Sequence, residues 1–149
     1  MQGTTPFTLS ADYGQTEMTN HSKIPYYRDP NLLKLAQGEP CLLNIHPLCK
    51  GEEGSTVAAA HSNAGEHGKG KSIKAQDCYS VWSCHICHSH LDQGMSMTLR
   101  EKEKAFDQAF VRQVKEWERI ANSPTMRPWK VEACRKVLQH LEKVPFLED

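Results

Sequence analysis

The sequence predicts an α+β fold in which a small metal-rich core is followed by two longer helices. Three short runs with the composition of β-strands lie between loops before residue 84. Apolar residues recur at helical spacing in the second half. Six cysteines and eight histidines exceed what a small cytosolic core normally uses, which indicates metal-ligand chemistry in the core.

Local signals predict the individual elements. Asp29 and Pro30 supply an N-cap and a first-turn proline for a short helix over residues 31–36, and Gly38 ends it. Thr98 and Glu101 have the capping-box pattern that begins a longer helix. We expect strands at residues 41–45, 56–61 and 79–83, and helices at residues 87–93, from Thr98 to before Pro124, and from Pro128 to near Pro145.

Apolar stripes on the last two helices predict that both pack against the core or against a second copy of the chain. The first stripe consists of Phe106, Phe110, Val114, Trp117 and Ala121, and the second of Val131, Cys134, Val137, Leu138 and Leu141. We expect a flexible arm at residues 1–27, a zinc-stapled core at residues 28–97 and a helical extension at residues 98–149.

Charge and hydropathy exclude two classes of protein. Eighteen Lys and Arg residues balance eighteen Asp and Glu residues, so a polybasic nucleic-acid coat is excluded and any nucleic-acid contact must be local. No apolar run approaches the roughly 18 residues needed to cross a bilayer, which excludes a membrane protein. The N-terminus lacks the basic start and apolar stretch of a signal peptide, so we expect a reducing compartment and no structural disulfides.

Four cysteines are spaced as ligands of a structural zinc ion. Cys84 and Cys87 form a C-x-x-C knuckle, and Cys41 and Cys49 lie in a strand-loop unit that ends about 35 residues earlier. Two cysteine pairs separated by a small subdomain are typical of a closed tetrahedral site, in which four thiolates replace the core that short strands cannot build. The first pair is more widely spaced than usual, so His46 is an alternative to one of its thiolates.

The cysteines also allow other interpretations. The run from Cys84 to His88 matches the C-x-x-C-H of c-type haem attachment, which needs an export signal that the sequence lacks. A redox pair would need a thioredoxin-like βαβ context, which is also missing. Cys78 and Cys134 have no partner at ligand spacing and are expected to be buried and reduced.

Three further side chains are candidates for a hydrolytic site. His88 and Asp92 lie four residues apart on one face of a predicted helix, so both can hold one divalent cation. His61 ends a predicted strand, and histidine side chains can take a proton from water near neutral pH. Each residue alone would more often be a surface histidine or a helix cap. Their order around the zinc knuckle favours a site.

The loop after His61 carries three lysines that can contact phosphate: Lys69, Lys71 and Lys74. Residues 65–72 match the P-loop pattern G-x-x-x-x-G-K-[ST]. No helical stripe follows the Lys-Ser pair, and no apolar strand ending in Asp follows to hold magnesium. We therefore favour contact with a DNA backbone over nucleotide binding.

The zinc knuckle and the strand histidine belong to a longer pattern that carries a family resemblance. It comprises Cys41, Cys49, Ala60-His61, Gly70, Ile73-Lys74, Asp77 and Cys84-x-x-Cys87-His88-x-x-x-Asp92. With this pattern, the segment from Leu32 to Asp92 resembles the YbcO-like nucleases of lambdoid phages and prophages, which are similar to HNH endonucleases of the His-Me finger (ββα-metal) superfamily. The last helices lie outside the segment. The resemblance implies a small ββα-metal core with a treble-clef-like structural zinc site, followed by C-terminal helices.

The resemblance also implies a role for each candidate residue. His61 would be the general base, and His88 and Asp92 would bind a catalytic Mg²⁺ or Mn²⁺ ion. Asp77 lies near the position of the central Asn in the HNH pattern, which orients the base, so it is a candidate for that role.

Ala60 departs from the HNH pattern, because many HNH enzymes have an acidic residue or a histidine directly before the base. With two protein ligands, the cation would rely on water and phosphate oxygens, which suits Mg²⁺. His67 and His85 are left open as further ligands.

The predicted function is that of a metal-dependent DNA endonuclease in phage DNA recombination or processing, in the cytoplasm of a bacterial host. Expected partners are DNA and phage or host recombination proteins, and a homodimer is compatible with the helices. The alternative is a zinc-stapled module that binds DNA or protein without catalysis and needs neither His61 nor Asp92. The form of the DNA is left open, because no element with readable base contacts is present.

Overall fold

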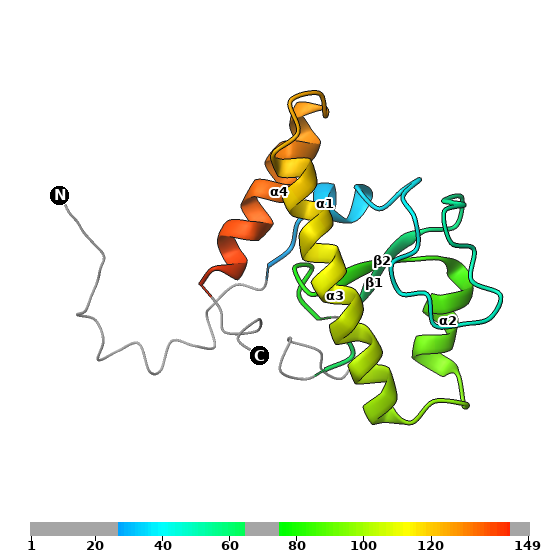
Figure 1. Ribbon diagram of the computed structural model, residues 1–149. Helices are drawn as coiled ribbons and strands as arrows, with labels where there is room; N and C mark the ends of the chain where they lie inside the picture. Colours follow the sequence, from blue (N-terminus) through cyan, green and yellow to red (C-terminus); the bar gives the residue numbers. More distant parts are fainter. Residues whose placement is uncertain (1–26, 65–74, 144–149) are drawn as a thin grey trace, which may run out of the picture.

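The computed structural model describes residues 27–64 and 75–143. Its elements are, in chain order, α1 (Pro30–Lys34), β1 (Ala58–His61), β2 (Ser80–Ser83), α2 (His85–Gln93), α3 (Leu99–Ala121) and α4 (Pro128–Leu141) (Figure 1). This mixture of helices with a small sheet confirms the predicted α+β class. None of the described helices is long and apolar enough to cross a membrane.

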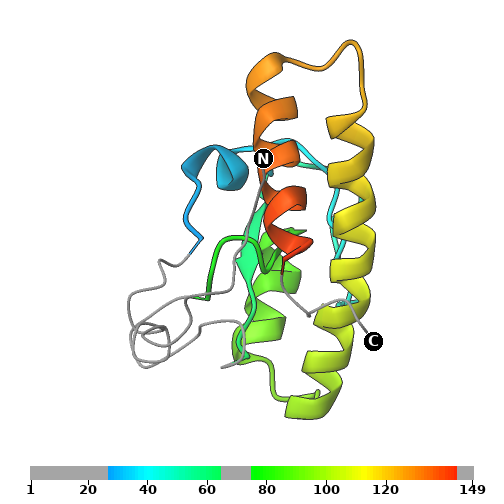
Figure 2. The same ribbon diagram turned by 90° about the vertical axis from the view of Figure 1, so that its left-hand side faces the viewer.

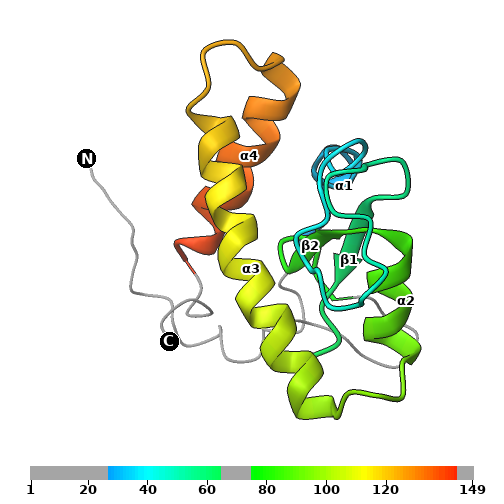
Figure 3. The same cartoon turned by 45° about the vertical axis from the view of Figure 1, so that its right-hand side comes forward.

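The two strands form an antiparallel sheet that lies between helices. His61 pairs with Ser80, and Ala58 pairs with Ser83. α3 packs against α4 and β2, whereas α1 packs against α4 and β1. Figure 2 shows α3 and α4 as an antiparallel pair, and Figure 3 shows this pair on one side of the sheet and α2 on the other.

Capping interactions set the helix ends that the sequence predicts. The Oδ1 atom of Asp29 accepts a hydrogen bond from the N–H of Asn31 at 3.0 Å, which begins α1. Gly38 follows with a φ of +83°, a conformation that favours glycine. Thr98 and Glu101 form both hydrogen bonds of the capping box, at 2.8 and 3.1 Å, at the start of α3.

One buried core joins the sheet to the long helices. Phe110 of α3 packs against Tyr79 and Trp117, with ring centroids 6.1 and 6.0 Å away. The fully buried Gln113 accepts the N–H of Trp82 at 2.8 Å through Oε1. A side chain of α3 thus satisfies a backbone donor on the edge of β2 that does not pair with β1. All residues of the two predicted apolar stripes are buried or half-buried, which confirms that both helices pack against the core.

The predicted strand at residues 41–45 is wrong. Its Leu42 donates an N–H to the carbonyl of Trp82 at 2.8 Å, beside β2. Asn44, however, has a φ of +47°, which interrupts extended backbone. The segment therefore lies beside β2 without forming a regular strand of the sheet.

The bounds of several helices also differ from the prediction. α1 spans Pro30–Lys34 instead of residues 31–36. α2 begins at His85, two residues before the predicted start, because the sulfur of Cys84 acts as its N-cap and accepts the N–H of Cys87 at 3.5 Å. α4 ends at Leu141, and the predicted end near Pro145 lies outside the described residues. The arm predicted at residues 1–27 also lies outside them, apart from residue 27, and the domain boundary at residue 97 stays a prediction.

Candidate active site and metal centre

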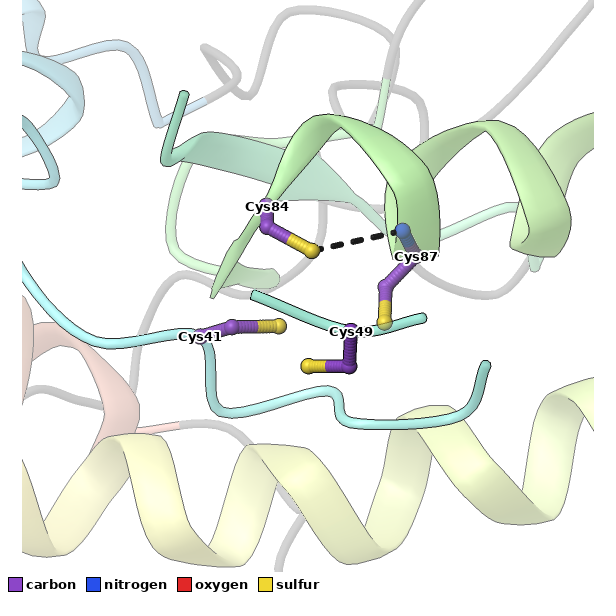
Figure 4. A group of neighbouring side chains, drawn as sticks. All are labelled: Cys41, Cys49, Cys84 and Cys87. Carbon is purple, nitrogen blue, oxygen red and sulfur yellow. Dashed lines mark hydrogen bonds between the residues drawn. The ribbon is translucent and has the colours of Figure 1, made fainter. Parts of the chain in front are cut away.

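Four cysteines from two distant parts of the chain meet beside α2. Cys84 and Cys87 lie at the start of this helix, whereas Cys41 and Cys49 come from the segment between α1 and β1. Their sulfur atoms all lie within 4.8 Å of one another, and Figure 4 shows them pointing toward a common centre. A tetrahedral zinc ion would hold its sulfur ligands about 3.8 Å apart, so small side-chain movements would close the cluster. The predicted group can therefore bind a metal such as zinc.

Backbone N–H groups point at each of the four sulfur atoms. The donors are Asn44 to Cys41 at 3.5 Å, Gly51 to Cys49 at 3.3 Å, Cys87 to Cys84 at 3.5 Å and Ile45 to Cys87 at 3.3 Å. Gly51 has a φ of +59°, so the turn that aims its N–H favours glycine. Hydrogen bonds of this kind stabilise the thiolate, which is the form that binds a metal.

The thiols of the cluster differ in proton affinity. Burial alone would raise the pKa of Cys84, but hydrogen bonds from the backbone of Lys50 and Cys87 and from the Cys87 and Cys41 side chains lower it to about 7. Burial raises the pKa of Cys87 to about 12 and also raises that of Cys49. Adjacent thiolates repel one another, so all four thiols would lose their protons only when a bound cation offsets this repulsion.

The other two cysteines are buried and free, as predicted. Burial raises the pKa of Cys78 and of Cys134 to about 12, so both are neutral packing groups. His46, the alternative zinc ligand, is not among the four clustered ligands. Its Nδ1 accepts the N–H of Leu48 at 3.0 Å, and its ring packs edge-on against His90.

A histidine and a carboxylate meet at one end of the sheet. The Nε2 atom of His61, the last residue of β1, lies 2.8 Å from Oδ1 of Asp77, in the turn before β2. The Asp77 side chain is 6% exposed, and backbone and side-chain groups of the segment before α1 contact its carboxylate. The N–H of Asp29 donates to its Oδ2 at 2.7 Å, and the guanidinium of Arg28 lies 3.4 Å from its Oδ1.

These contacts determine the charge of Asp77. Burial by itself would raise the pKa of Asp77, but the hydrogen bonds from His61 and the Asp29 N–H, together with the charges of His61 and Arg28, hold it below its usual value. Asp77 is therefore an ionised acceptor at neutral pH. It follows that Nε2 of His61 donates, which leaves the lone pair of a neutral imidazole on Nδ1.

The two candidate ligands on α2 also contact each other. Nε2 of His88 lies 3.4 Å from Oδ2 of Asp92, one helical turn later. The other carboxylate oxygen, Oδ1, accepts a hydrogen bond of 3.1 Å from the side-chain amide of Asn63, just beyond β1. The Asn63 amide thus ties the metal-ligand candidate on α2 to the end of the strand that carries His61.

One pocket of about 350 Å³ connects these groups. Its lining consists of Leu33, Ala58, Ala59, His61, Ser62, Asn63, Ala75, His88 and Asp92. The structure thus brings His61, His88 and Asp92 to one cavity and sets Asp77 against His61. In this cavity, the imidazole of His61 can accept a proton, and the side chains of His88 and Asp92 can hold a small cation.

The sequence reasoning missed three residues of this site: Arg28, Asp29 and Asn63. Asn63 had a signal, since it lies two residues after His61 and alternate residues of an extended chain share a face. Arg28 and Asp29 had none, because they precede their partner Asp77 by 49 and 48 positions.

Other predicted residues lie elsewhere. His85 lines a separate pocket of about 350 Å³ together with His46 and His90. Ala60 is fully buried, so its position offers no ligand. The residues of the phosphate-binding prediction and one further histidine lie outside the described part of the chain: Lys69, Lys71, Lys74, the P-loop-like run 65–72 and His67.

The fold and the two sites define a small α+β protein with a candidate metal centre beside a pocket lined by histidine and carboxylate. The chain belongs to the family described as "Putative nuclease YbcO", whose sequence model matches residues 30–122. Membership confirms the resemblance to the YbcO nucleases and indicates nuclease activity, with DNA as the expected substrate. The match includes α3, so the expectation that the last helices lie outside the family segment is wrong for this helix. Comparisons with curated proteins and with solved structures gave no match.

Proposed function

We propose that the chain is a metal-dependent DNA endonuclease that hydrolyses phosphodiester bonds with one histidine as general base. The observation that carries the proposal is the 2.8 Å contact between His61 and the buried Asp77 carboxylate, at a pocket that His88 and Asp92 also line. A strand that ends in a histidine, an antiparallel second strand and a helix with two candidate ligands support an HNH-type, His-Me finger arrangement of β1, β2 and α2. Family membership supports the reaction class.

His61 acts as the general base through Nδ1 in this proposal. The water oxygen bonds to phosphorus, its proton passes to Nδ1, and the bond from phosphorus to the leaving sugar oxygen breaks. The imidazole becomes positively charged in this step, and the carboxylate of Asp77, 2.8 Å from Nε2, stabilises it. The leaving oxygen takes a proton from solvent.

His88 and Asp92 would hold the catalytic cation. Their side chains are 35% and 40% exposed, so water and phosphate oxygens can complete the coordination shell. One imidazole and one carboxylate fit Mn²⁺ and also Mg²⁺, which keeps several waters. When bound, such a cation stabilises the negative charge that develops on the phosphate oxygens. The hydrogen bond from Asn63 makes that residue a positioning residue for Asp92.

The four-cysteine cluster has a structural role in this proposal. Cys84 caps the helix that carries His88 and Asp92, so a Zn²⁺ ion at the cluster would fix that helix in a treble-clef-like arrangement. We assign phosphate contacts to three lysines that follow β1 in the sequence, Lys69, Lys71 and Lys74.

We also propose a biological setting on the strength of the family resemblance alone. It is phage DNA recombination or processing in the bacterial cytoplasm, with phage or host recombination proteins, or a second copy of the chain, as partners.

The test is cleavage of supercoiled, linear duplex and single-stranded DNA by the full chain with Mg²⁺ or Mn²⁺, beside EDTA controls. His61→Ala is compared with His90→Ala as a control, because His90 lies on α2 but lines the pocket of His46 and His85 and not the pocket of His61. Zinc content and thermal unfolding are measured for each variant, to separate loss of chemistry from loss of fold.

We expect metal-dependent cutting that falls about 100-fold or more in His61→Ala and persists in His90→Ala, with zinc content unchanged. Cutting by His61→Ala at the wild-type rate would overturn the assignment of the base. If wild type and His61→Ala are equally inert on every DNA form but bind DNA, the chain is a zinc-stapled binding module instead.

A further inference from the structure

Another pocket, of about 270 Å³ and called the second pocket from here on, lies between α2 and the first half of α3. Figure 3 shows these two helices joined by a short loop at their lower ends. The second pocket shares Ser62, Asn63 and Asp92 with the pocket that contains His61 and His88. The two cavities therefore adjoin, and a ligand in the second would lie directly beside the proposed reaction centre.

Apolar side chains form part of the wall of this pocket. Leu91 and Phe106 are only 3% and 4% exposed, so they belong to the core and present a fixed surface. Leu99, in contrast, is 72% exposed at the start of α3. A flat apolar ligand would cover this leucine, which water otherwise surrounds.

The polar part of the wall is acidic. Asp92, Glu103 and Asp107 supply three carboxylates, against one cationic side chain, Lys102. The Nζ atom of Lys102 donates to the carbonyl of Gly94 at 2.7 Å, so its charge is engaged at the junction of the two helices. A phosphate group would meet net negative charge in this pocket, whereas an uncharged group with N–H donors would find acceptors.

We propose that this second pocket holds an unpaired nucleobase of the DNA strand that is cut, next to the scissile phosphate. A nucleobase has the required chemistry: it is flat and uncharged, and its edge carries N–H donors. The pocket is slightly smaller than the roughly 300 to 1,000 Å³ of sites for drug-sized ligands, which suits one base. The inference rests on the proposed function, and it adds the form of the substrate.

Single-stranded or locally unpaired DNA is the substrate class that follows. A base inside a duplex must leave both its stack and its pair before it can enter such a pocket, and this costs more free energy than moving a base of a single strand. Stacking on apolar and aromatic side chains tolerates any sequence, so the site selects for strand form more than for sequence.

The test compares three DNA forms of one sequence: a single strand, a duplex, and a single strand with a run of abasic residues. Wild-type cleavage is measured with Mn²⁺. Binding is measured separately by fluorescence anisotropy with His61→Ala, so that the bound DNA stays intact. Leu99→Ser removes the exposed apolar wall, and Val111→Ser is its matched control, because Val111 is a half-exposed residue of α3 outside the pocket lining.

We expect the intact single strand to be bound and cut at least about fivefold better than the duplex and the abasic strand. Leu99→Ser should lose most of this preference, and Val111→Ser should keep it. Equal binding of intact and abasic single strands would overturn the base pocket, as would equal losses in the two serine variants. Cutting of all three forms at one rate would overturn the base pocket but leave the nuclease intact. Discrimination in binding without any cutting would support the base pocket and refute the nuclease.

Discussion

Replacing Asp77 with asparagine would separate the charge of this carboxylate from its shape. In the wild type, Oδ2 accepts the N–H of Asp29 at 2.7 Å, and Oδ1 lies 2.8 Å from Nε2 of His61. An asparagine has one acceptor oxygen. If that oxygen keeps the bond to Asp29, the NH₂ group faces His61 and donates to Nε2. The imidazole then carries its own proton on Nδ1, and the lone pair proposed to accept the water proton is lost.

The expected loss of cleavage is therefore that of a whole general base, about 100- to 10,000-fold. The free energy of unfolding should fall by only about 1–3 kcal/mol, because the buried site keeps its hydrogen bonds to Asp29 and His61 in neutral form and loses only their charged character and the contact with Arg28. Chemistry and stability should thus respond on very different scales.

Three measurements check this prediction: cleavage rates at saturating metal, urea unfolding, and the ¹⁵N shifts of the His61 ring, which report its tautomer. Glu132→Gln, at an exposed position of α4, is the control for the loss of one negative charge. An Asp77→Asn protein that cuts DNA at the wild-type rate, or that keeps the wild-type tautomer, would refute the reasoning.

Three further outcomes are expected. Cys84→Ser should release zinc and lower the Tm, whereas Cys134→Ala should keep its zinc, and a Cys84→Ser protein with full zinc content would contradict the ligand assignment. His88→Ala should raise the Mn²⁺ concentration needed for half-maximal cleavage and His90→Ala should not, so equal metal titrations would count against His88 as a ligand. Because the pKa of Asp77 in the folded chain lies below its ordinary value of 3.8, its contribution to stability is complete above about pH 4 and is lost as the pH falls through the folded pKa. The stability difference between wild type and Asp77→Asn should shrink as the pH falls below about 4 in acid-titrated urea unfolding, and a constant difference would show that the folded pKa is not lowered.

Local hydrogen bonding explains which elements could be predicted. The cap at Asp29 and the capping box of Thr98 and Glu101 join atoms of residues two or three positions apart. Such signals need no tertiary information. The strand predicted at residues 41–45 is wrong because the backbone of Asn44 has a φ of +47°. The contacts that hold this segment come from far along the chain and have no local signal: the carbonyl of Leu42 accepts two hydrogen bonds from Arg112, 70 positions away, at 3.1 and 2.6 Å.

The sequence by itself determined which chemical groups this protein can use: two pairs of cysteine thiols as candidate metal ligands, a histidine at the end of a strand, and a His-Asp pair one helical turn apart. Only the tertiary structure decided how they meet. The pairing of β1 with β2 sets His61 against Asp77 over 16 positions, and the packing of α2 sets Asn63 against Asp92 over 29. The physical reason is that periodicity and capping act within a turn or two of chain, whereas distances between such groups depend on how buried surfaces pack.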